Sequence, residues 1–244
     1  MEVNVSETKE QMGRKAAKIS EQKINAAISQ SGQANIILAT GASQFETLKN
    51  LVNADVDWSK VNMFHLDEYI GIGRDHPASF CRYLQERFVD KVDSLKSVNF
   101  VDGLANPRHV CDELGQLILN HPIDVAMVGI GENCHLAFND PPADFDTEEP
   151  YIIVTLDEDC RKQQYGEGWF ESIEDVPEKA ISMSIQQILK STSIIVPVPD
   201  KRKAQAVKNA IEGPVTNMHP ASILQEHEDC LVFLDRPAAA YLEK

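Results

Sequence analysis

The chain has 244 residues, of which 43% are hydrophobic and 25% charged, a composition typical of folded rather than disordered proteins. A chain of this length buries enough apolar surface to form a core without disulfides or metal ions. Its 38 acidic and 23 basic residues give a formal net charge of -15, which disfavours nucleic acids and anionic membranes as partners.

Neither a targeting signal nor a cysteine pair is visible in the sequence. The first ten residues, MEVNVSETKE, contain no basic start and no apolar core, so they predict no signal peptide. No apolar run approaches the ~20 residues of a membrane span. The five cysteines are scattered and form no CxxC pair, which predicts reduced thiols and neither a zinc site nor a disulfide framework. We therefore expect a cytoplasmic protein.

Strand and helix patterns alternate along the chain, with no internal repeat or linker. In chain order they predict a helix (7–30), a strand (35–39), a turn (40–43), a helix (44–52), a strand (61–66), a helix (79–92), a strand (98–103), a helix (111–121), four strands (124–131, 151–156, 180–185 and 193–199), a helix (201–213) and a strand (230–235). Such alternation predicts an α/β fold, with one Rossmann-like domain over residues 1–244 and a mainly parallel sheet covered by helices on both faces.

Ligands bind such sheets beyond the carboxyl ends of the strands, and the first of these ends carries a phosphate-loop pattern. After the strand at 35–39 come four small residues, namely Thr40, Gly41, Ala42 and Ser43. They allow close approach of a ligand, and the following helix start offers free N–H groups to a phosphate. The alternative is an ordinary strand–helix turn with Ser43 as the helix cap.

Two adjacent acids follow the strand at 61–66. Asp67 or Glu68 could act as a base on a carbon-bound proton if it faces the ligand. The alternative is a helix cap or a salt bridge.

The strand at 124–131 leads into a loop that contains a histidine. His135 lies between Asn133 and Asp140, which could orient its ring, so we interpret His135 as a catalytic group rather than a structural one. A Cys/His nucleophile pair with Cys134 is disfavoured, because adjacency in sequence does not bring two side chains together.

Two further segments complete the predicted site. After the strand at 193–199 come three cations, Lys201, Arg202 and Lys203, any of which could bind a phosphate. The polar, glycine-containing stretch at residues 161–177 is typical of an active-site lid, the alternative being a surface helix followed by a loop.

These segments together resemble the glucosamine-6-phosphate deaminase/isomerase family. The resemblance covers about residues 36–235, through LATGAS, HLDEYIGI, DHPASF, GIGENCHLAFNDP, VPEKAISMSI, DKRKAQAVKNAIEGPV and PASILQ. The related 6-phosphogluconolactonases share the fold but typically have DER where this chain has DEY, and a different run after the histidine. The resemblance implies a cofactor-free and metal-free conversion of an amino-sugar phosphate, glucosamine 6-phosphate or a close isomer, to a ketose 6-phosphate and ammonium.

The family's functional positions map onto this sequence. Asp67 matches the base that moves a proton from C2 to C1, and His135 the group that opens the sugar ring, supported by Asp140 and Asn133. The phosphate loop matches residues 40–43, with Lys203 as the phosphate lysine.

The sequence departs from the family pattern at four positions. Asn133 replaces an aspartate, which leaves Asp140 as the only charged partner of His135 within the motif and predicts that Asn133→Asp raises the rate. Cys134 and Ala42 replace glycines, and Gly168 replaces an arginine of the lid.

Two alternative functions remain open on the sequence. The first is a 6-phosphogluconolactonase-like hydrolase, which the DEY run disfavours and Asn133 favours. The second is a non-catalytic sugar-phosphate-binding protein. The changes at 133, 134 and 168 favour it, whereas the retention of Asp67 and His135 disfavours it. A homo-oligomer is compatible with either.

Overall fold

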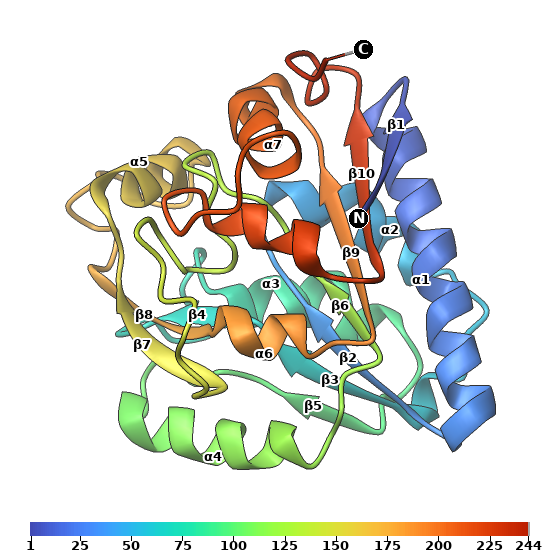
Figure 1. The fold of residues 1–244 in the computed structure, drawn as a ribbon. Coiled ribbons are helices and arrows are strands. Elements are labelled where there is room, and N and C mark those ends of the chain that lie inside the picture. The colour runs from blue at the N-terminus through green and yellow to red at the C-terminus, as the bar shows by residue number, and fades with distance from the viewer. Residues whose placement is uncertain (244) are drawn as a thin grey trace.

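The larger of two β-sheets forms the centre of the protein. The computed structural model describes residues 1–243 (Figure 1). Seven strands lie in the order β1-β10-β9-β6-β2-β3-β5, and each neighbouring pair is parallel. They are β1 (Glu2–Ser6), β2 (Ala34–Leu38), β3 (Val61–His65), β5 (Ser97–Asn99), β6 (Val125–Met127), β9 (Ser193–Val198) and β10 (Cys230–Asp235). The predicted parallel sheet is confirmed.

The strand order reverses between β2 and β6. From β2 the chain builds outward through β3 to β5, then returns to the other side of β2 with β6 and continues to β9 and β10. At such a reversal the loops that follow the two central strands lead away from each other and leave a crevice. The loops after β2 and β6 contain the predicted phosphate loop and His135.

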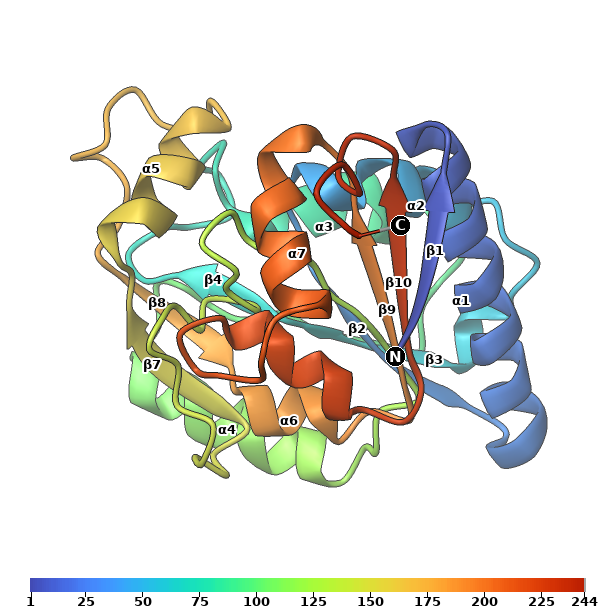
Figure 2. The same ribbon diagram turned by 45° about the horizontal axis from the view of Figure 1, so that its top comes forward.

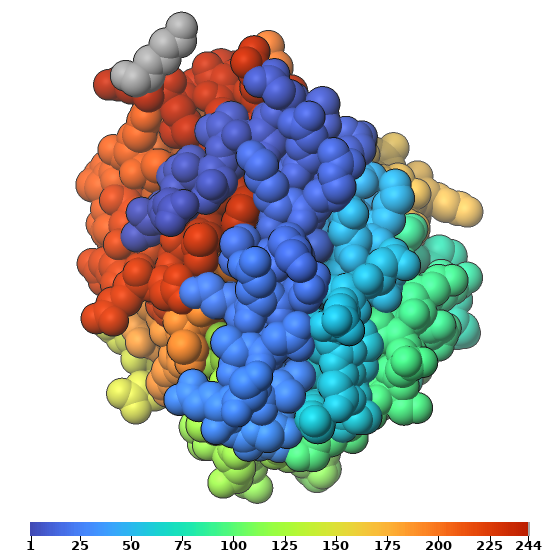
Figure 3. All heavy atoms as spheres, turned by 90° about the vertical axis from the view of Figure 1, so that its right-hand side faces the viewer, coloured from blue at the N-terminus to red at the C-terminus, as the bar shows by residue number. Residues whose placement is uncertain are grey.

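Helices cover both faces of this sheet, as predicted. One face packs against α1 (Lys9–Ser31), α2 (Phe45–Leu51) and α3 (Phe80–Arg87), and α1 crosses that side of the molecule (Figure 3). The other face packs against α4 (Pro107–Leu119), α6 (Ile185–Leu189) and α7 (Ala204–Ile211). Side chains of β2 alternate between the two cores, with Ile36 and Leu38 in the first and Ile37 in the second.

A second sheet, which was not predicted, lies beside the first (Figure 2). It is antiparallel, in the order β4-β8-β7, and consists of β4 (Asp67–Tyr69), β7 (Tyr151–Thr155) and β8 (Lys179–Met183). The strands at 151–156 and 180–185 were expected, but not their separate sheet, and β4 was not expected at all. A three-residue strand has no periodicity to detect. In β7 only Tyr151 is buried, so this strand also lacks the regular alternation of a strand with one solvated face.

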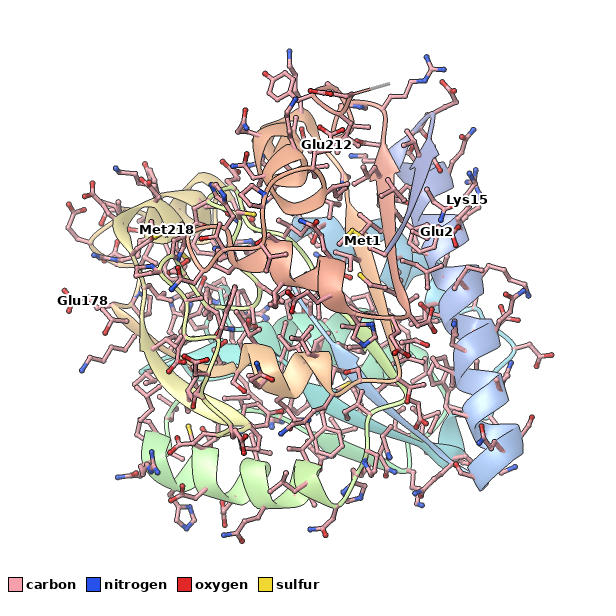
Figure 4. All side chains as sticks on the ribbon, in the orientation of Figure 1. Met1, Glu2, Lys15, Glu178, Glu212 and Met218 are labelled. Carbon is pink, nitrogen blue, oxygen red and sulfur yellow. The ribbon has the colours of Figure 1, made fainter. Side chains whose placement is uncertain are left out.

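Other elements also lie outside the predicted set. β1 pairs with the edge of β10, and Figure 4 shows Met1 and Glu2 at this side of the sheet. The helix α5 (Glu158–Gly166) follows β7, and five short 3-10 segments complete the fold: η1 (Ala42–Gln44), η2 (Trp58–Lys60), η3 (Val89–Lys91), η4 (Lys201–Lys203) and η5 (Pro220–Glu226). Within residues 1–243, no helix combines the length and apolar character that crossing a membrane requires.

Candidate active site

A cavity of about 240 Å³ lies at the carboxyl end of the large sheet. Its walls come from the ends of β2, β3, β6 and β9 and from α5. The residues at 40–43, Asp67, His135 and Lys203 all line it, so the structure brings four predicted strand ends together. Asn133 and Asp140 do not line this cavity. Asn133 contacts the backbone of His135 and Asp140 contacts its ring.

The loop at 40–43 is held open toward the cavity. Gly41 has a φ of 86°, a left-handed conformation that favours glycine, and the Tyr83 hydroxyl donates a hydrogen bond to its carbonyl at 2.9 Å. Within residues 1–243, the amides of Gly41 and Ala42 donate to no other group. Ser43 does not cap the helix with its side chain, so the alternative of a simple capped turn is wrong. The loop therefore offers donors to an anion.

The two adjacent acids have separate roles. The Glu68 carboxylate accepts four hydrogen bonds, from the Ser79 hydroxyl and from the amides of Tyr69, Phe80 and Cys81, at 2.8–3.2 Å. It thus caps the start of α3. Asp67 lies at the cavity wall, and its carboxylate makes no hydrogen bond or ion pair to any residue that the structure describes. Of the two, only Asp67 is free to act on a ligand.

Asp67 lies in surroundings that disfavour its charge. Burial, reinforced by the neighbouring Glu68 carboxylate, raises the pKa of Asp67 well above the ordinary value for an aspartate. A carboxylate with a raised pKa is a stronger base than an exposed one, which suits removal of a proton from carbon.

Replacing Asp67 by Asn should stabilise the fold. Because the pKa of Asp67 is higher in the folded than in the unfolded chain, the free energy of unfolding falls as pH rises above the ordinary carboxyl value of 3.8. We expect Asp67→Asn to melt several degrees higher than the unsubstituted protein at pH 8, since ~1 kcal/mol shifts Tm by about 2–4 °C in a chain of this size. The gain should shrink toward pH 4. Thermal unfolding at both pH values measures it, with the exposed Asp55→Asn as control, and a lower Tm at pH 8 would contradict the unfavourable charge.

Gly131 makes room for the His135 ring. A Cβ atom at Gly131 would lie 2.3–2.4 Å from three atoms of that ring. Nδ1 of His135 lies 3.1 Å from Oδ1 of Asp140, but it is not aligned for a hydrogen bond. Catalytic contacts of this kind often tighten only when substrate binds. Since Nδ1 faces Asp140, Nε2 is the nitrogen left for a ligand.

Asp140 is a charged partner of His135. Burial alone would raise its pKa, but contact with His135, together with donors from the Asn133 amide and the Asp157 backbone, holds the pKa below its ordinary value. Asn133 donates to Asp140 at 3.0 Å and to Asp157 at 3.1 Å. Asp157, which no sequence pattern singled out, is therefore a second carboxylate near the histidine motif.

The two cysteines near His135 are unreactive thiols. Cys134 has a φ of 71°, the conformation that the glycine of the family pattern would favour, and its thiol points to the Ala206 carbonyl at 3.5 Å. Burial raises the pKa of Cys134 to about 11 and also raises the pKa of Cys160. Cys160, His135 and Asp140 each offer one potential ligand atom, and these atoms lie within 4.8 Å of one another.

The three cations after β9 differ in their surroundings. Lys201 is exposed and does not line the cavity, whereas Arg202 lines it but pairs with Glu132 at 3.2 Å and Asp200 at 3.6 Å. Lys203 is buried at 6% exposure, and its ammonium pairs with no acid within 4 Å among residues 1–243. Burial lowers the pKa of Lys203. Among the three cations after β9, its unpaired charge marks it as the one available to an anionic ligand.

The predicted lid is an ordered helix and loop beside the cavity. Residues 161–166 belong to α5, in agreement with the alternative of a helix followed by a loop. Gln163, Gln164 and Glu167 nevertheless line the cavity. The Tyr69 hydroxyl donates to Gln164 at 2.7 Å, which ties α5 to β4. Gly168, at the position of the family's lid arginine, has a φ of 83°. Opening and closing of this segment stay a prediction.

Several cavity residues were missed from the sequence. Gln163 and Gln164 lie on α5 and Glu167 follows it. They fall in the stretch predicted as a lid, but no pattern singled them out, nor Phe80 at the start of α3. Lys9 begins α1 just after the carboxyl end of β1, a strand that was not predicted, so no pattern pointed to it.

Comparison with known proteins identifies the family of this chain. The family model for glucosamine-6-phosphate isomerases/6-phosphogluconolactonase matches residues 7–233. The glucosamine-6-phosphate deaminase of Lacticaseibacillus paracasei is 40% identical over 211 residues, which cover 85% of this chain and 86% of that protein. The solved structure of a monomeric glucosamine-6-phosphate deaminase of the NagB superfamily has a TM-score of 0.89 and 32% identity, over 98% of this chain and 99% of that one. The 6-phosphogluconolactonase from Trypanosoma brucei shares the fold, with a TM-score of 0.81 at 17% identity over 99% of this chain and 98% of that one. This chain therefore belongs to the family of glucosamine-6-phosphate isomerases and 6-phosphogluconolactonases.

Proposed function

We propose that this protein converts glucosamine 6-phosphate, or a close isomer, and water to a ketose 6-phosphate and ammonium. One observation supports this above the others: a single cavity holds an unpaired buried carboxylate, a histidine and an unpaired buried cation, from Asp67, His135 and Lys203. The reaction needs a base for carbon, an acid/base for the sugar ring and a partner for phosphate, and the cavity supplies one candidate for each.

The phosphate is assigned to the loop at 40–43 and to Lys203. The free amides of Gly41 and Ala42 and the hydroxyls of Thr40 and Ser43 can donate to its oxygens, while Lys203 adds positive charge. A protein of net charge -15 has to bind a dianion through such local groups.

The Lys203→Ala variant should lose substrate affinity more than turnover. A charge-assisted hydrogen bond contributes about 1.5–3 kcal/mol, so KM should rise about 10- to 100-fold. We expect kcat to change less than KM, because the phosphate does not react. The neighbouring Lys201→Ala, at an exposed position, is the matched control, and steady-state kinetics measure both. An unchanged KM in Lys203→Ala would contradict the assignment.

His135 is assigned to ring opening. Its Nε2 can take the proton of the sugar's C1 hydroxyl and return a proton to the ring oxygen, which gives the open-chain aldehyde. Asp140, held charged by its donors, stabilises the protonated ring of His135.

Asp67 is assigned to the proton transfer at carbon. In the open chain the C2 proton is acidified by the neighbouring aldehyde, so a carboxylate can remove it. The resulting enolamine is protonated at C1 to give a ketose imine. Water then adds to the imine carbon, and ammonia leaves with a proton as ammonium.

The two alternative functions, a lactone hydrolase and a non-catalytic binding protein, account for fewer features of the cavity. The likeness to 6-phosphogluconolactonases is at 17% identity and extends to the fold, and this chain has DEY where they typically have DER. A protein that only bound sugar phosphates would gain nothing from Asp67, because a buried unpaired carboxylate destabilises the fold.

Ammonium release from a panel of amino-sugar phosphates tests the proposal. We expect release from glucosamine 6-phosphate or one of its isomers, and no hydrolysis of 6-phosphogluconolactone. Lactone hydrolysis without ammonium release would favour the first alternative, and binding without turnover of any substrate would favour the second.

Three broader proposals accompany this function. All five cysteines are free thiols in the structure, which supports work in a reducing cytoplasm. The likeness to a monomeric glucosamine-6-phosphate deaminase supports activity as a monomer. The small sheet shares a core with the large one through Tyr151, Ile181 and Met183, which supports one domain.

A further inference from the structure

We propose that Asp157 is a positioning residue for the His135–Asp140 pair, acting through Asn133 and through its own backbone amide. The inference rests on the proposed function and adds a residue that lies outside the histidine motif.

The Asn133 side chain is matched to two carboxylates and one amide. Its Nδ2 donates to Oδ1 of Asp140 at 3.0 Å and to Oδ2 of Asp157 at 3.1 Å, while its Oδ1 accepts from the His135 backbone N–H at 3.1 Å. A carboxamide has two N–H donors, and here each has an acid to bind. Asn133 thus joins the two acids to the histidine loop.

Asp157 fixes the other oxygen of Asp140. The Asp157 backbone N–H donates to Oδ2 of Asp140 at 3.0 Å. The Asp157 side chain also accepts from the Cys160 amide, and so caps α5. The direction of the Asp140 carboxylate is therefore set from both sides, and one side is the start of the helix that lines the cavity through Gln163 and Gln164.

This arrangement explains why position 133 carries an amide. An aspartate in the same place would put an oxygen about 3 Å from both Asp140 and Asp157, where Asn133 now places N–H groups. Three carboxylates in contact cannot all remain charged without a large penalty. Asp140 and Asp157 already supply two acids to this site, so a third acid at position 133 would have no donor for the oxygen that replaces Nδ2. The contacts thus reverse the expectation from the sequence that Asn133→Asp raises the rate.

A double-mutant cycle with glucosamine 6-phosphate tests the inference. We expect Asn133→Asp and Asp157→Asn each to lower kcat at least about tenfold with KM changed less than about threefold, because the carboxylate behind the histidine is misplaced while the phosphate site is intact. In the double variant the two acids and one amide are restored, so kcat should recover at least about fivefold relative to Asn133→Asp, within the usual range of coupling between contacting residues.

Asp159→Asn is the matched control, because it removes an exposed carboxylate from the same turn of α5 and should leave kcat and KM unchanged. A faster or unaffected Asn133→Asp enzyme, or a double variant no better than it, would overturn the inference even if the unsubstituted protein releases ammonium. Thermal unfolding of the same proteins measures the coupling between residues 133 and 157 independently of activity. Asn133→Asp should lower Tm by several degrees, and adding Asp157→Asn to it should restore part of that loss. Absence of that coupling would overturn the inference whatever the substrate.

Discussion

The Asp67→Asn variant is expected to lose at least about 100-fold in kcat for glucosamine 6-phosphate, with KM changed less than about threefold. The amide has the size of the carboxylate but cannot accept a proton from carbon. Because Glu68 is fully engaged at the start of α3, it cannot replace the missing base. Steady-state measurement of ammonium release gives both constants.

The surface change Asp55→Asn is the control for this variant, since it also replaces aspartate by asparagine but lies outside the cavity lining. It should behave like the unsubstituted protein. Turnover of Asp67→Asn within a few-fold of that protein would show that another group moves the C2 proton.

The Gly131→Ala variant should lose about 100-fold in kcat for a purely steric reason. The added Cβ would lie 2.3–2.4 Å from Nε2, Cδ2 and Cε1 of His135, so the ring has to leave its position. A displacement of about 1 Å at a reacting group can lower a rate about 100-fold. Steady-state kinetics should show this loss mainly in kcat, since the loop at 40–43 and Lys203 are untouched.

Gly166→Ala is the matched control, because a Cβ there meets no atom within 4 Å and the residue lies on the neighbouring α5. It should keep kcat within about twofold. A Gly131→Ala enzyme as active as Gly166→Ala would mean that turnover does not require the His135 ring to stay against Gly131.

The strand ends could be predicted because their signals are local. A short apolar strand followed by polar or small residues is visible in the sequence, and parallel strands place such residues at one edge of the sheet. Thr40 and His135 were found in this way. The pattern also marked the acid pair at 67–68 and the cations at 201–203, among which the family resemblance selected Asp67 and Lys203, and all four residues line one cavity. The roles assigned to them stay predictions that the variants above test.

The parts that escaped prediction depend on contacts distant in sequence. Whether Asp67 or Glu68 faces the cavity is decided by donors from the start of α3, which no local pattern around the two acids can reveal. Asp157 is 24 residues from Asn133, and their contact exists only because β7 joins the small sheet. Lys9 lines the cavity from the start of α1, whose place is set by β1 and its pairing with β10 far along the chain.

The most direct test of the proposed reaction follows the hydrogen at C2. The unsubstituted protein is supplied with glucosamine 6-phosphate that carries deuterium at C2, and ammonium and the sugar product are measured together. We expect ammonium and ketose 6-phosphate in equal amounts, with the deuterium removed from C2 and found at C1 or in water. A product that retains the deuterium at C2, or a sugar phosphate consumed without ammonium, would contradict the account.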